Sequence, residues 1–454
     1  MGEDSVMKYV IIGGDAAGMS AAMQIKKYDP SAHITIVEKG NVYSYGQCGL
    51  PYVIGGVVKD EQQLIARDVD VYRNKFGMDA KVGHEITELD TVAKNVIGKD
   101  MSKGTDFVIP YDRLLIATGA DPFVPKWSGG ELKGIHTLKT IPDALKIQQE
   151  IDRVQDVTIV GGGYIALEMA ENFHRLGKTV RLLIRSDQIM RSLDKGISEK
   201  IESEANKYGI EIAYEEEIET IIGEQRVERI QTNKRTFSTD LILVATGIRP
   251  NTKFLKNTNI KTMENGAIYV NECLETNVPD VYAAGDCATQ YHRLKKQTDY
   301  VALGTHANKQ GRIAGMNMAN KHREYRGMVG TSILKFMELT IGKSGLSEAE
   351  AEKLSIPYDS VMMDVANIAS YYPDVKELSI KINYRTDNGL LLGGQLIGEA
   401  GVDKRIDVIA TALFNQMTVR DLEDLDLSYA PPYNGVYDPI QQVARKATSK
   451  LEEQ

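Results

Sequence analysis

Two copies of one strand–turn–helix–strand pattern constrain the fold of this chain more than any other feature of its sequence. Residues 8–12 read KYVII, an apolar run typical of a buried strand, and a glycine-rich turn follows directly. A run of small residues then suits a closely packed helix, and residues 33–38 form the next strand. A second unit of the same kind begins at Val157. Two such βαβ units predict an α/β chain with two Rossmann-like dinucleotide-binding domains.

The glycine turns of both units are suited to hold a pyrophosphate, because a strand, a tight turn and a helix start present backbone N–H groups to it. The second turn fits the G-x-G-x-x-A pattern with Gly161, Gly163 and Ala166. The first turn has Gly13, Gly14 and Gly18 but departs from the pattern at one position. In that turn Asp15 stands where the pattern has its middle glycine. Its side chain would crowd a pyrophosphate unless it points away.

The last residue of the second strand in each unit indicates which dinucleotide is bound. The first unit ends on Glu38, and an acidic residue at this place hydrogen-bonds ribose hydroxyls. The second unit has Arg185 at the matching strand end, with Arg191 nearby. A carboxylate there would repel a 2′-phosphate, whereas an arginine binds it with two hydrogen bonds. The second unit therefore predicts NADPH, with NADH as the alternative.

Composition excludes several other classes of protein. The chain has 454 residues, ordinary globular usage and three cysteines, Cys48, Cys273 and Cys287, which exclude a disulfide-rich scaffold and a four-cysteine zinc site. We expect no metal site. The net charge of −9 disfavours nucleic acids and anionic membranes as partners. No apolar run reaches the length of a membrane span, so we expect a cytoplasmic protein. The polar residues 1–6 precede a second methionine and are left out of the fold prediction.

From Met7 onward the chain resembles the pyridine nucleotide-disulfide oxidoreductases. The resemblance rests on the two βαβ units, on the similar strand ends LLIATGA at 114–120 and LILVATGIRP at 241–250, and on the AAGDC turn. It implies FAD in the first unit, with Asp286 at the ribitol side of the flavin, and NAD(P)H in the second. The implied domains are an FAD-binding domain over 7–120 and 247–328, an NAD(P)H-binding domain over 121–246, and a C-terminal α+β dimerisation domain over 329–454. The implied assembly is a homodimer.

The segment around Cys48 assigns a subclass by the same resemblance. Two-cysteine members carry Cys-x4-Cys here and a C-terminal histidine, but this chain has Val53 at the second position and no histidine after His322. One-cysteine oxidases and peroxidases keep a histidine in the first turn, where this chain has Ala16. The remaining main subclass is the coenzyme A disulfide reductases. One alternative is an NADH oxidase or peroxidase, and another is a CoA-linked persulfide or polysulfide reductase. Persulfide reductases of this kind often carry a fused rhodanese domain, for which we expect no room before Gln454.

The resemblance also assigns roles to individual residues. The motifs YYP and SYAPPY in the last third place Tyr371 and Tyr429 as the tyrosines that reach into the partner subunit's active site. The residues that match the lining of the coenzyme A site are Ser20, Gln24, Lys27, Ser44, Gln47 and Lys75. Gln47, directly before the cysteine, stands where the family often has asparagine. A non-enzymatic flavin-binding redox sensor is a further alternative, disfavoured because both nucleotide motifs are intact.

The chemistry expected of Cys48 follows from its neighbours. Gly49-Leu50-Pro51 is typical of a helix start, and a helix N-terminus or a nearby cation lowers the pKa of a thiol. We therefore expect a Cys48 thiolate that attacks CoA disulfide and forms a Cys48–S–S–CoA mixed disulfide. Electrons from NADPH, passed through FAD, then release the second CoA. Tyr429 of the partner subunit is expected to donate the proton, with Tyr371 orienting it.

Overall fold

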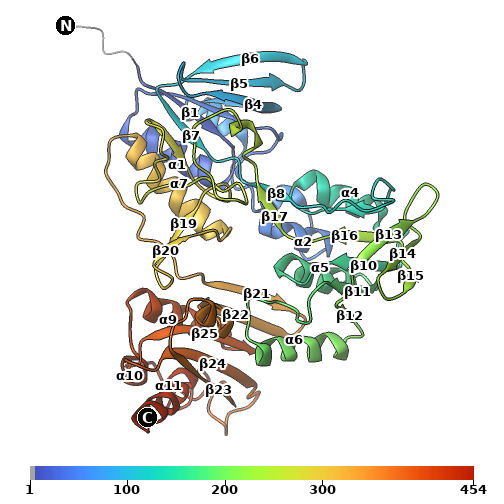
Figure 1. Ribbon diagram of the computed structural model, residues 1–454, viewed down its shortest axis with the longest axis vertical. Coiled ribbons are helices and arrows are strands. Elements are labelled where there is room, and N and C mark those ends of the chain that lie inside the picture. Colours follow the sequence, from blue (N-terminus) through green and yellow to red (C-terminus); the bar gives the residue numbers. More distant parts are fainter. Residues whose placement is uncertain (1–5, 454) are drawn as a thin grey trace.

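The computed structural model describes residues 6–453, which contain three five-stranded sheets (Figure 1). Nearly all of the N-terminal segment that we left out of the prediction therefore lies outside the described residues. None of the helices in the described part of the chain is long and apolar enough to cross a membrane. The fold class predicted from the sequence is confirmed.

The first sheet is parallel, with the strand order β18-β7-β1-β2-β3. Its strands are β1 (Lys8–Ile12), β2 (His33–Val37), β3 (Asp79–Lys81), β7 (Arg113–Ile116) and β18 (Val281–Ala283). Helices α1 (Ala16–Tyr28) and α7 (Gly304–Met318) lie side by side next to it (Figure 1). They approach closely because Gly311 and Gly315 of α7 face Ala17 and Ala21 of α1, where a Cβ atom would not fit.

The second sheet is also parallel, with the order β12-β11-β10-β16-β9. Its strands are β9 (Ile135–His136), β10 (Asp156–Val160), β11 (Thr179–Ile184), β12 (Glu211–Tyr214) and β16 (Leu241–Val244). The accompanying helices are α4 (Ile141–Ile151), α5 (Tyr164–Arg175) and α6 (Lys195–Lys207). Their apolar faces and the sheet share one core, so both predicted βαβ units are present.

The third sheet is antiparallel, with the order β21-β22-β25-β24-β23. Its strands are β21 (Ser332–Phe336), β22 (Leu339–Gly345), β23 (Tyr358–Ala366), β24 (Glu377–Arg385) and β25 (Leu391–Gly398). The helices of this part are α8 (Glu348–Lys353), α9 (Val402–Phe414), α10 (Val419–Glu423) and α11 (Pro439–Glu452). Helices α9 and α11 bury their apolar faces with the sheet in a separate core. The predicted C-terminal α+β domain is confirmed.

Smaller elements connect and flank the large sheets. Two three-stranded sheets contain β4 (His84–Asp90), β5 (Asn95–Asp100) and β6 (Thr105–Pro110), and β13 (Ile218–Ile222), β14 (Arg229–Thr232) and β15 (Thr236–Ser238). Two hydrogen-bonded strand pairs are β8 (Ala120–Pro122) with β17 (Ile248–Pro250), and β19 (Gln290–His292) with β20 (Gln297–Asp299). The short helices α2 (Leu50–Ile54) and α3 (Val69–Asn74) follow the segment that carries Cys48.

The first glycine of each nucleotide turn lies against the neighbouring strand end. Gly13 and Gly161 have φ angles of 112° and 131°, which favour glycine. A Cβ atom on Gly13 would overlap the carbonyl of Ala117, and one on Gly161 would overlap the carbonyl of Ala245. These alanines begin the two similar Ala-Thr-Gly sequences. Each glycine motif and each Ala-Thr-Gly motif are thus the two sides of one backbone contact.

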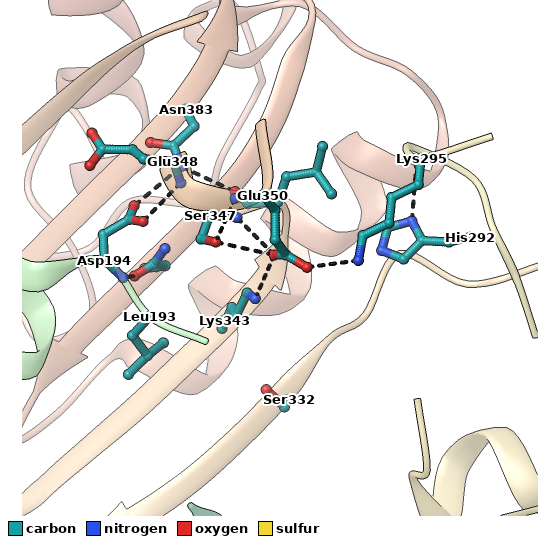
Figure 2. Close-up of polar contacts among 12 residues, drawn as sticks. Leu193, Asp194, His292, Lys295, Ser332, Lys343, Ser347, Glu348, Glu350 and Asn383 are labelled. Atoms are coloured by element: carbon teal, nitrogen blue, oxygen red, sulfur yellow. Dashed lines mark hydrogen bonds and ion pairs between the residues drawn. The ribbon is translucent and has the colours of Figure 1, made fainter. Parts of the chain in front are cut away.

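Buried charges join helix α6 to the C-terminal sheet (Figure 2). Asp194, the N-cap of α6, accepts hydrogen bonds from the Glu348 backbone N–H at 2.8 Å and the Asn383 side chain at 3.2 Å. Its carboxylate also pairs with Lys381 at 3.1 Å, and both of these side chains are less than a tenth exposed. The Asp194 carboxylate is bound from several sides, so its removal would leave the polar groups of its partners buried with one acceptor fewer.

A second part of this network reaches the β19–β20 hairpin. Glu350 accepts from Lys343 at 3.0 Å and from Lys295 at 2.8 Å (Figure 2). Lys343 is on β22 of the C-terminal sheet, whereas Lys295 is in the turn between β19 and β20. The C-terminal sheet is therefore held by charged side chains to two segments that precede it in the chain.

We expect Asp194→Ala to destabilise the protein by about 3 kcal/mol, because it removes the buried carboxylate that pairs with Lys381 and accepts hydrogen bonds from the Glu348 N–H and the Asn383 side chain. Urea denaturation of the FAD-loaded protein measures this loss. Arg420→Ala is the control, since Arg420 and Glu452 form an exposed pair, and such pairs contribute less than about 1 kcal/mol. Equal midpoints for the two variants would contradict the structural role of the buried pair.

Candidate active site

Glu38 organises the first nucleotide turn. Its carboxylate accepts the Gly14 N–H at 2.7 Å and the Gly40 N–H at 2.6 Å. Gly18, in the first turns of α1, packs against the carbonyl of Gly13, where a Cβ atom would not fit. The predicted residues of this turn are thus brought together. A tight glycine backbone against the start of a helix fits the pyrophosphate of a dinucleotide such as FAD.

Asp15 directs its side chain toward the segment that precedes Cys48. One carboxylate oxygen accepts the Tyr45 backbone N–H at 3.2 Å, and the other accepts the Gln47 side-chain N–H at 2.7 Å. Although Asp15 is the N-cap of α1, its side chain makes no capping hydrogen bond. Burial raises the pKa of Asp15 to about 6, against the opposing effect of these two hydrogen bonds. The residue that departs from the glycine pattern is therefore bound to the cysteine segment.

Cys48 lies in a single 3₁₀ turn, Gln47–Gly49, directly before α2. The predicted helix start is confirmed, with Pro51 in its first turn. The expectation that this position lowers the pKa of the thiol is wrong. The residue is exposed, but the surrounding protein still desolvates its sulfur, and this desolvation together with the charge of Glu168 raises the pKa of Cys48. The nearby cation, Lys139, opposes them with a smaller effect.

Charged groups from three other segments surround Cys48. Lys139, before α4, lies 3.4 Å from the carboxylate of Asp286 in the Gly-Asp turn. Glu168, on α5 of the second unit, accepts a long hydrogen bond of 3.4 Å from the hydroxyl of Tyr52. Burial raises the pKa of Glu168 to about 7. Both nucleotide units therefore contribute charged side chains to the surroundings of one sulfur.

The sequence analysis missed Lys139, Glu168 and Tyr52. Lys139 stands next to the capping box of Thr140 and Asp143 and belongs to no nucleotide motif. Glu168 lies between the buried residues Leu167 and Met169 on α5. A carboxylate among apolar helix positions was the one feature of the sequence that could have indicated a functional residue here. Neither residue is near Cys48 in sequence, so only the packing of the two units brings them together.

The second nucleotide turn has an open approach. Gly163 is the N-cap of α5, no side chain caps this helix, and a Cβ atom on Gly163 would meet no atom within 4 Å. Ala166 is fully buried, as close helix–strand packing requires. Arg185 follows β11 directly, and within residues 6–453 neither it nor Arg191 forms an ion pair. The turn fits a dinucleotide, and the arginine at its strand end has no competing carboxylate.

The two predicted tyrosines lie together in the C-terminal domain. The hydroxyl oxygens of Tyr371 and Tyr429 are 3.2 Å apart, and the two residues are 74% and 48% exposed. In the described part of the chain, no hydrogen bond connects either of them to the segment of Cys48. Further exposed side chains on the same two loops are Tyr372, Val375, Tyr433, Val436 and Tyr437. Aromatic residues exposed in such numbers are typical of a protein interface.

A buried guanidinium holds the loops of both tyrosines. Arg405, on α9, is 1% exposed and donates to the Asn367 carbonyl at 2.8 Å, four residues before Tyr371. It also donates to the carboxylate of Asp438 at 3.1 Å and to the Asn434 side chain at 3.2 Å, at the end of the other loop. The tyrosine pair is therefore placed by the core of the C-terminal domain.

The residues expected to line a coenzyme A site fall into three groups. Ser20, Gln24 and Lys27 are spaced to share one face of α1. Ser44 and Gln47 lie in the cysteine segment, and Lys75 is the exposed C-cap residue of α3. Ser20 donates to the Asn308 side chain on α7 at 3.0 Å. Within the described residues, neither lysine forms an ion pair, so both are available to an anionic ligand.

Comparison with known proteins adds a family and several relatives. Residues 7–311 match the family model "Pyridine nucleotide-disulphide oxidoreductase", and residues 331–438 match its dimerisation domain. An "NAD(P)H sulfur oxidoreductase (CoA-dependent)" of Pyrococcus abyssi is 38% identical over 96% of this chain and 97% of its own. A "Coenzyme A disulfide reductase" of Staphylococcus aureus is 33% identical over 97% of this chain and 99% of its own.

Two further relatives broaden the comparison. The crystal structure of reduced Bacillus anthracis CoADR-RHD superposes with a TM-score of 0.96 at 32% identity, over 99% of this chain and 81% of that one. An "NADH oxidase" of Methanocaldococcus jannaschii is 32% identical over 98% of this chain and 99% of its own. Relatives of nearly equal similarity thus carry different activities.

Glu168→Gln is expected to lower the pKa of the Cys48 thiol, because the ionised carboxylate raises it. At pH 8, above the pKa of Glu168, the variant should react with iodoacetamide faster than the parent, since a lower thiol pKa increases the thiolate fraction. The difference should shrink below about pH 6, where Glu168 is protonated in the parent protein.

Mass spectrometry of the Cys48 peptide measures this rate. Glu264→Gln, at an exposed position, is the control and should leave the rate unchanged. Identical pH profiles for Glu168→Gln and the parent would contradict the assigned charge effect.

Proposed function

The chain belongs to the pyridine nucleotide-disulphide oxidoreductase family, and we propose that it is a homodimeric FAD-containing reductase that uses NADPH to cleave coenzyme A disulfide at Cys48. The observation that carries the proposal is that, in the described residues, the single exposed cysteine directly follows Gln47, whose side chain is hydrogen-bonded to Asp15 of the first nucleotide turn. The other two are Cys287, which is fully buried, and Cys273, which lies beside His322. The second sulfur of a thiol–disulfide reaction must then come from the substrate.

The first step uses only groups of the chain and the substrate. The Cys48 thiolate attacks one sulfur of CoA disulfide, a Cys48–S–S–CoA bond forms, and the CoA–S–S–CoA bond breaks. One CoA thiolate leaves and takes up a proton. Burial and the charge of Glu168 raise the thiol pKa of Cys48, so protonation of Glu168 would increase the fraction of thiolate.

The residues that would hold the cofactors are those of the two turns. Gly13, Gly14, Gly18, Glu38 and Asp286 would hold FAD, and Gly161, Gly163, Ala166 and Arg185 would hold the nicotinamide dinucleotide. When bound, the two cofactors supply the electron pair that reduces the Cys48–S–S–CoA disulfide. Lys139 and Glu168 of the second unit both act on the charge of Cys48, so Lys139 can stabilise and Glu168 can protonate the thiolate that is released.

Tyr429 of the partner subunit is proposed as the proton donor to the leaving thiolate, with Tyr371 of the partner subunit orienting its hydroxyl. The 3.2 Å contact between the two hydroxyls and their exposure support this assignment. The matched dimerisation domain supports a homodimer in which these loops meet another copy. Both tyrosines would then act on the neighbouring Cys48.

A CoA-linked persulfide is the second candidate substrate, favoured by the CoA-dependent sulfur oxidoreductase of P. abyssi. Attack of Cys48 on the CoA sulfur of CoA–S–SH forms the same mixed disulfide and releases hydrosulfide. A fused rhodanese domain does not distinguish the two substrates, because the alignment with that CoA-dependent relative covers 97% of the relative's own length. An NADH oxidase is less well supported, since Ala16 stands where a histidine would be needed.

Cys48→Ser should abolish CoA disulfide reduction and leave FAD bound, because the serine hydroxyl cannot form the mixed disulfide. Turnover with NADPH and the FAD absorbance spectrum measure the two properties. Mass spectrometry of the untreated parent protein should show a CoA adduct on Cys48. Cys287→Ser is the control and should retain turnover. Unchanged turnover in Cys48→Ser would refute the mechanism.

Mixing Cys48→Ser protein with Tyr429→Phe protein should restore activity. Each heterodimer has one site with both an intact Cys48 and an intact tyrosine from the other subunit. Dissociation and reassociation of differently tagged subunits, followed by purification of the doubly tagged dimer, gives the sample. Activity near half that of the parent is expected. Inactive, FAD-loaded heterodimers would show that the tyrosine does not act across the interface.

Arg185→Glu should raise the KM for NADPH at least tenfold and change the KM for NADH little, because a carboxylate repels the 2′-phosphate. Steady-state kinetics with both nucleotides measure the effect. Arg175→Glu, on the same βαβ unit but at the end of α5, is the matched control. Equal increases in the KM for NADPH and the KM for NADH would contradict the assignment of Arg185 as the residue that selects the nucleotide.

A further inference from the structure

The backbone that carries Cys48 has little regular structure of its own. Residues 43–49 contain one 3₁₀ turn and belong to none of the large sheets. The segment is fixed by a few hydrogen bonds from outside. The Ser44 N–H donates to the Gly14 carbonyl at 2.9 Å, and the Gly46 N–H donates to the Leu64 carbonyl at 2.8 Å. The Ala66 N–H donates to the Ser44 carbonyl at 2.8 Å, the Tyr43 hydroxyl donates to the Lys81 carbonyl at 2.6 Å, and two further bonds are accepted by the side chain of Asp15.

Within residues 6–453, the side chain of Asp15 makes hydrogen bonds only to this segment. As the N-cap of α1 it could cap the helix, yet its side chain makes no such bond. Both carboxylate oxygens are used on the cysteine segment instead, one on the Tyr45 backbone and one on the Gln47 amide. Hydrogen bonds to an ionised acceptor are stronger than neutral ones. Asp15 therefore makes two of the strongest contacts that hold this segment.

Gln47 is the residue directly before Cys48, and its amide gives the shorter of the two bonds, at 2.7 Å. The bond fixes the side chain of a residue whose backbone continues into the cysteine. The acceptor of this bond, Asp15, lies in the turn that fits a dinucleotide. The position of the sulfur is thus tied directly to the position of the phosphate-binding backbone.

We propose that Asp15 is a positioning residue for Cys48, which acts through the hydrogen bond to Gln47 and fixes the sulfur relative to the first nucleotide turn. The aspartate is then a functional departure from the glycine pattern. The proposal rests on the proposed function only in taking Cys48 as the reactive cysteine. Its central test, the reactivity of the thiol, does not require turnover of CoA disulfide.

A double-mutant cycle tests the contact, with Asp15→Ala, Gln47→Ala and the double variant as FAD-loaded proteins at pH 8. Iodoacetamide labelling of the Cys48 peptide is followed by mass spectrometry. Gln47→Ala should label about tenfold faster, because loss of one charge-assisted hydrogen bond loosens the segment, and Asp15→Ala should label at least as fast, because it also removes the acceptor of the Tyr45 N–H. The double variant should label no faster than Asp15→Ala, since that variant already lacks the bond to Gln47.

Three further variants make the result specific. Asp15→Asn keeps an acceptor for Tyr45 and can pair with a reversed Gln47 amide, so it should label within about twofold of the parent. Asp112→Ala removes a carboxylate that accepts the Lys8 N–H at 2.7 Å elsewhere in the same sheet unit, and it should label at the parental rate. If Asp15→Ala does not bind FAD, the labelling rates of Gln47→Ala and Gln47→Glu test the same contact. Gln47→Glu places two carboxylates together, so it should also label faster than the parent.

Steady-state kinetics separate positioning from general damage. Gln47→Ala should lower kcat for CoA disulfide about tenfold and leave the KM for NADPH unchanged. Parental labelling of Gln47→Ala, or a double variant whose labelling rate equals the product of the single effects, would overturn the proposal. If the chain does not reduce CoA disulfide, the labelling cycle still gives the predicted coupling, so the two failures are distinguishable.

Discussion

The contact of a glycine with the backbone of a neighbouring strand end is the constraint on which both nucleotide units depend. Gly13 lies against Ala117, and Gly161 lies against Ala245, at distances that exclude a Cβ atom. This approach sets where α1 and α5 begin. In the first unit, the hydrogen bonds of Glu38 and Asp15 start from the same turn. The place of Cys48 is thus determined by a packing contact that does not involve the cysteine itself.

The reactive groups are held in two different ways. Cys48 is on a short irregular segment, and charges from both nucleotide units surround it, so its thiol pKa responds to those groups. The tyrosines are on loops fixed by Arg405, a guanidinium buried in the C-terminal core. In the proposed mechanism, the tyrosine pair would donate a proton from loops held by the domain core, whereas the Cys48 thiol would change its charge with its surroundings.

Local motifs were predictable from the sequence because their residues are neighbours in the chain. The strands, the glycine turns and the start of α2 follow from patterns over ten to thirty residues. Lys139, Glu168 and Arg405 were not predictable, since each acts on a segment far from it in sequence. The error about the thiol pKa of Cys48 has the same origin. The sequence indicates a helix start, but α2 has only five residues, and the opposing carboxylate comes from another unit.

The position of β18 has a consequence for synthesis. This strand lies beside β7 in the first sheet, yet the chain reaches it only after every strand of the second sheet. A ribosome adds about 5–20 residues per second, so the second sheet is complete in the nascent chain while the first still lacks one strand and the helix α7. During that interval β7 presents an open edge, which invites pairing with strands of other chains. The order of elements along the chain therefore leaves the first sheet incomplete for longer than the second during synthesis.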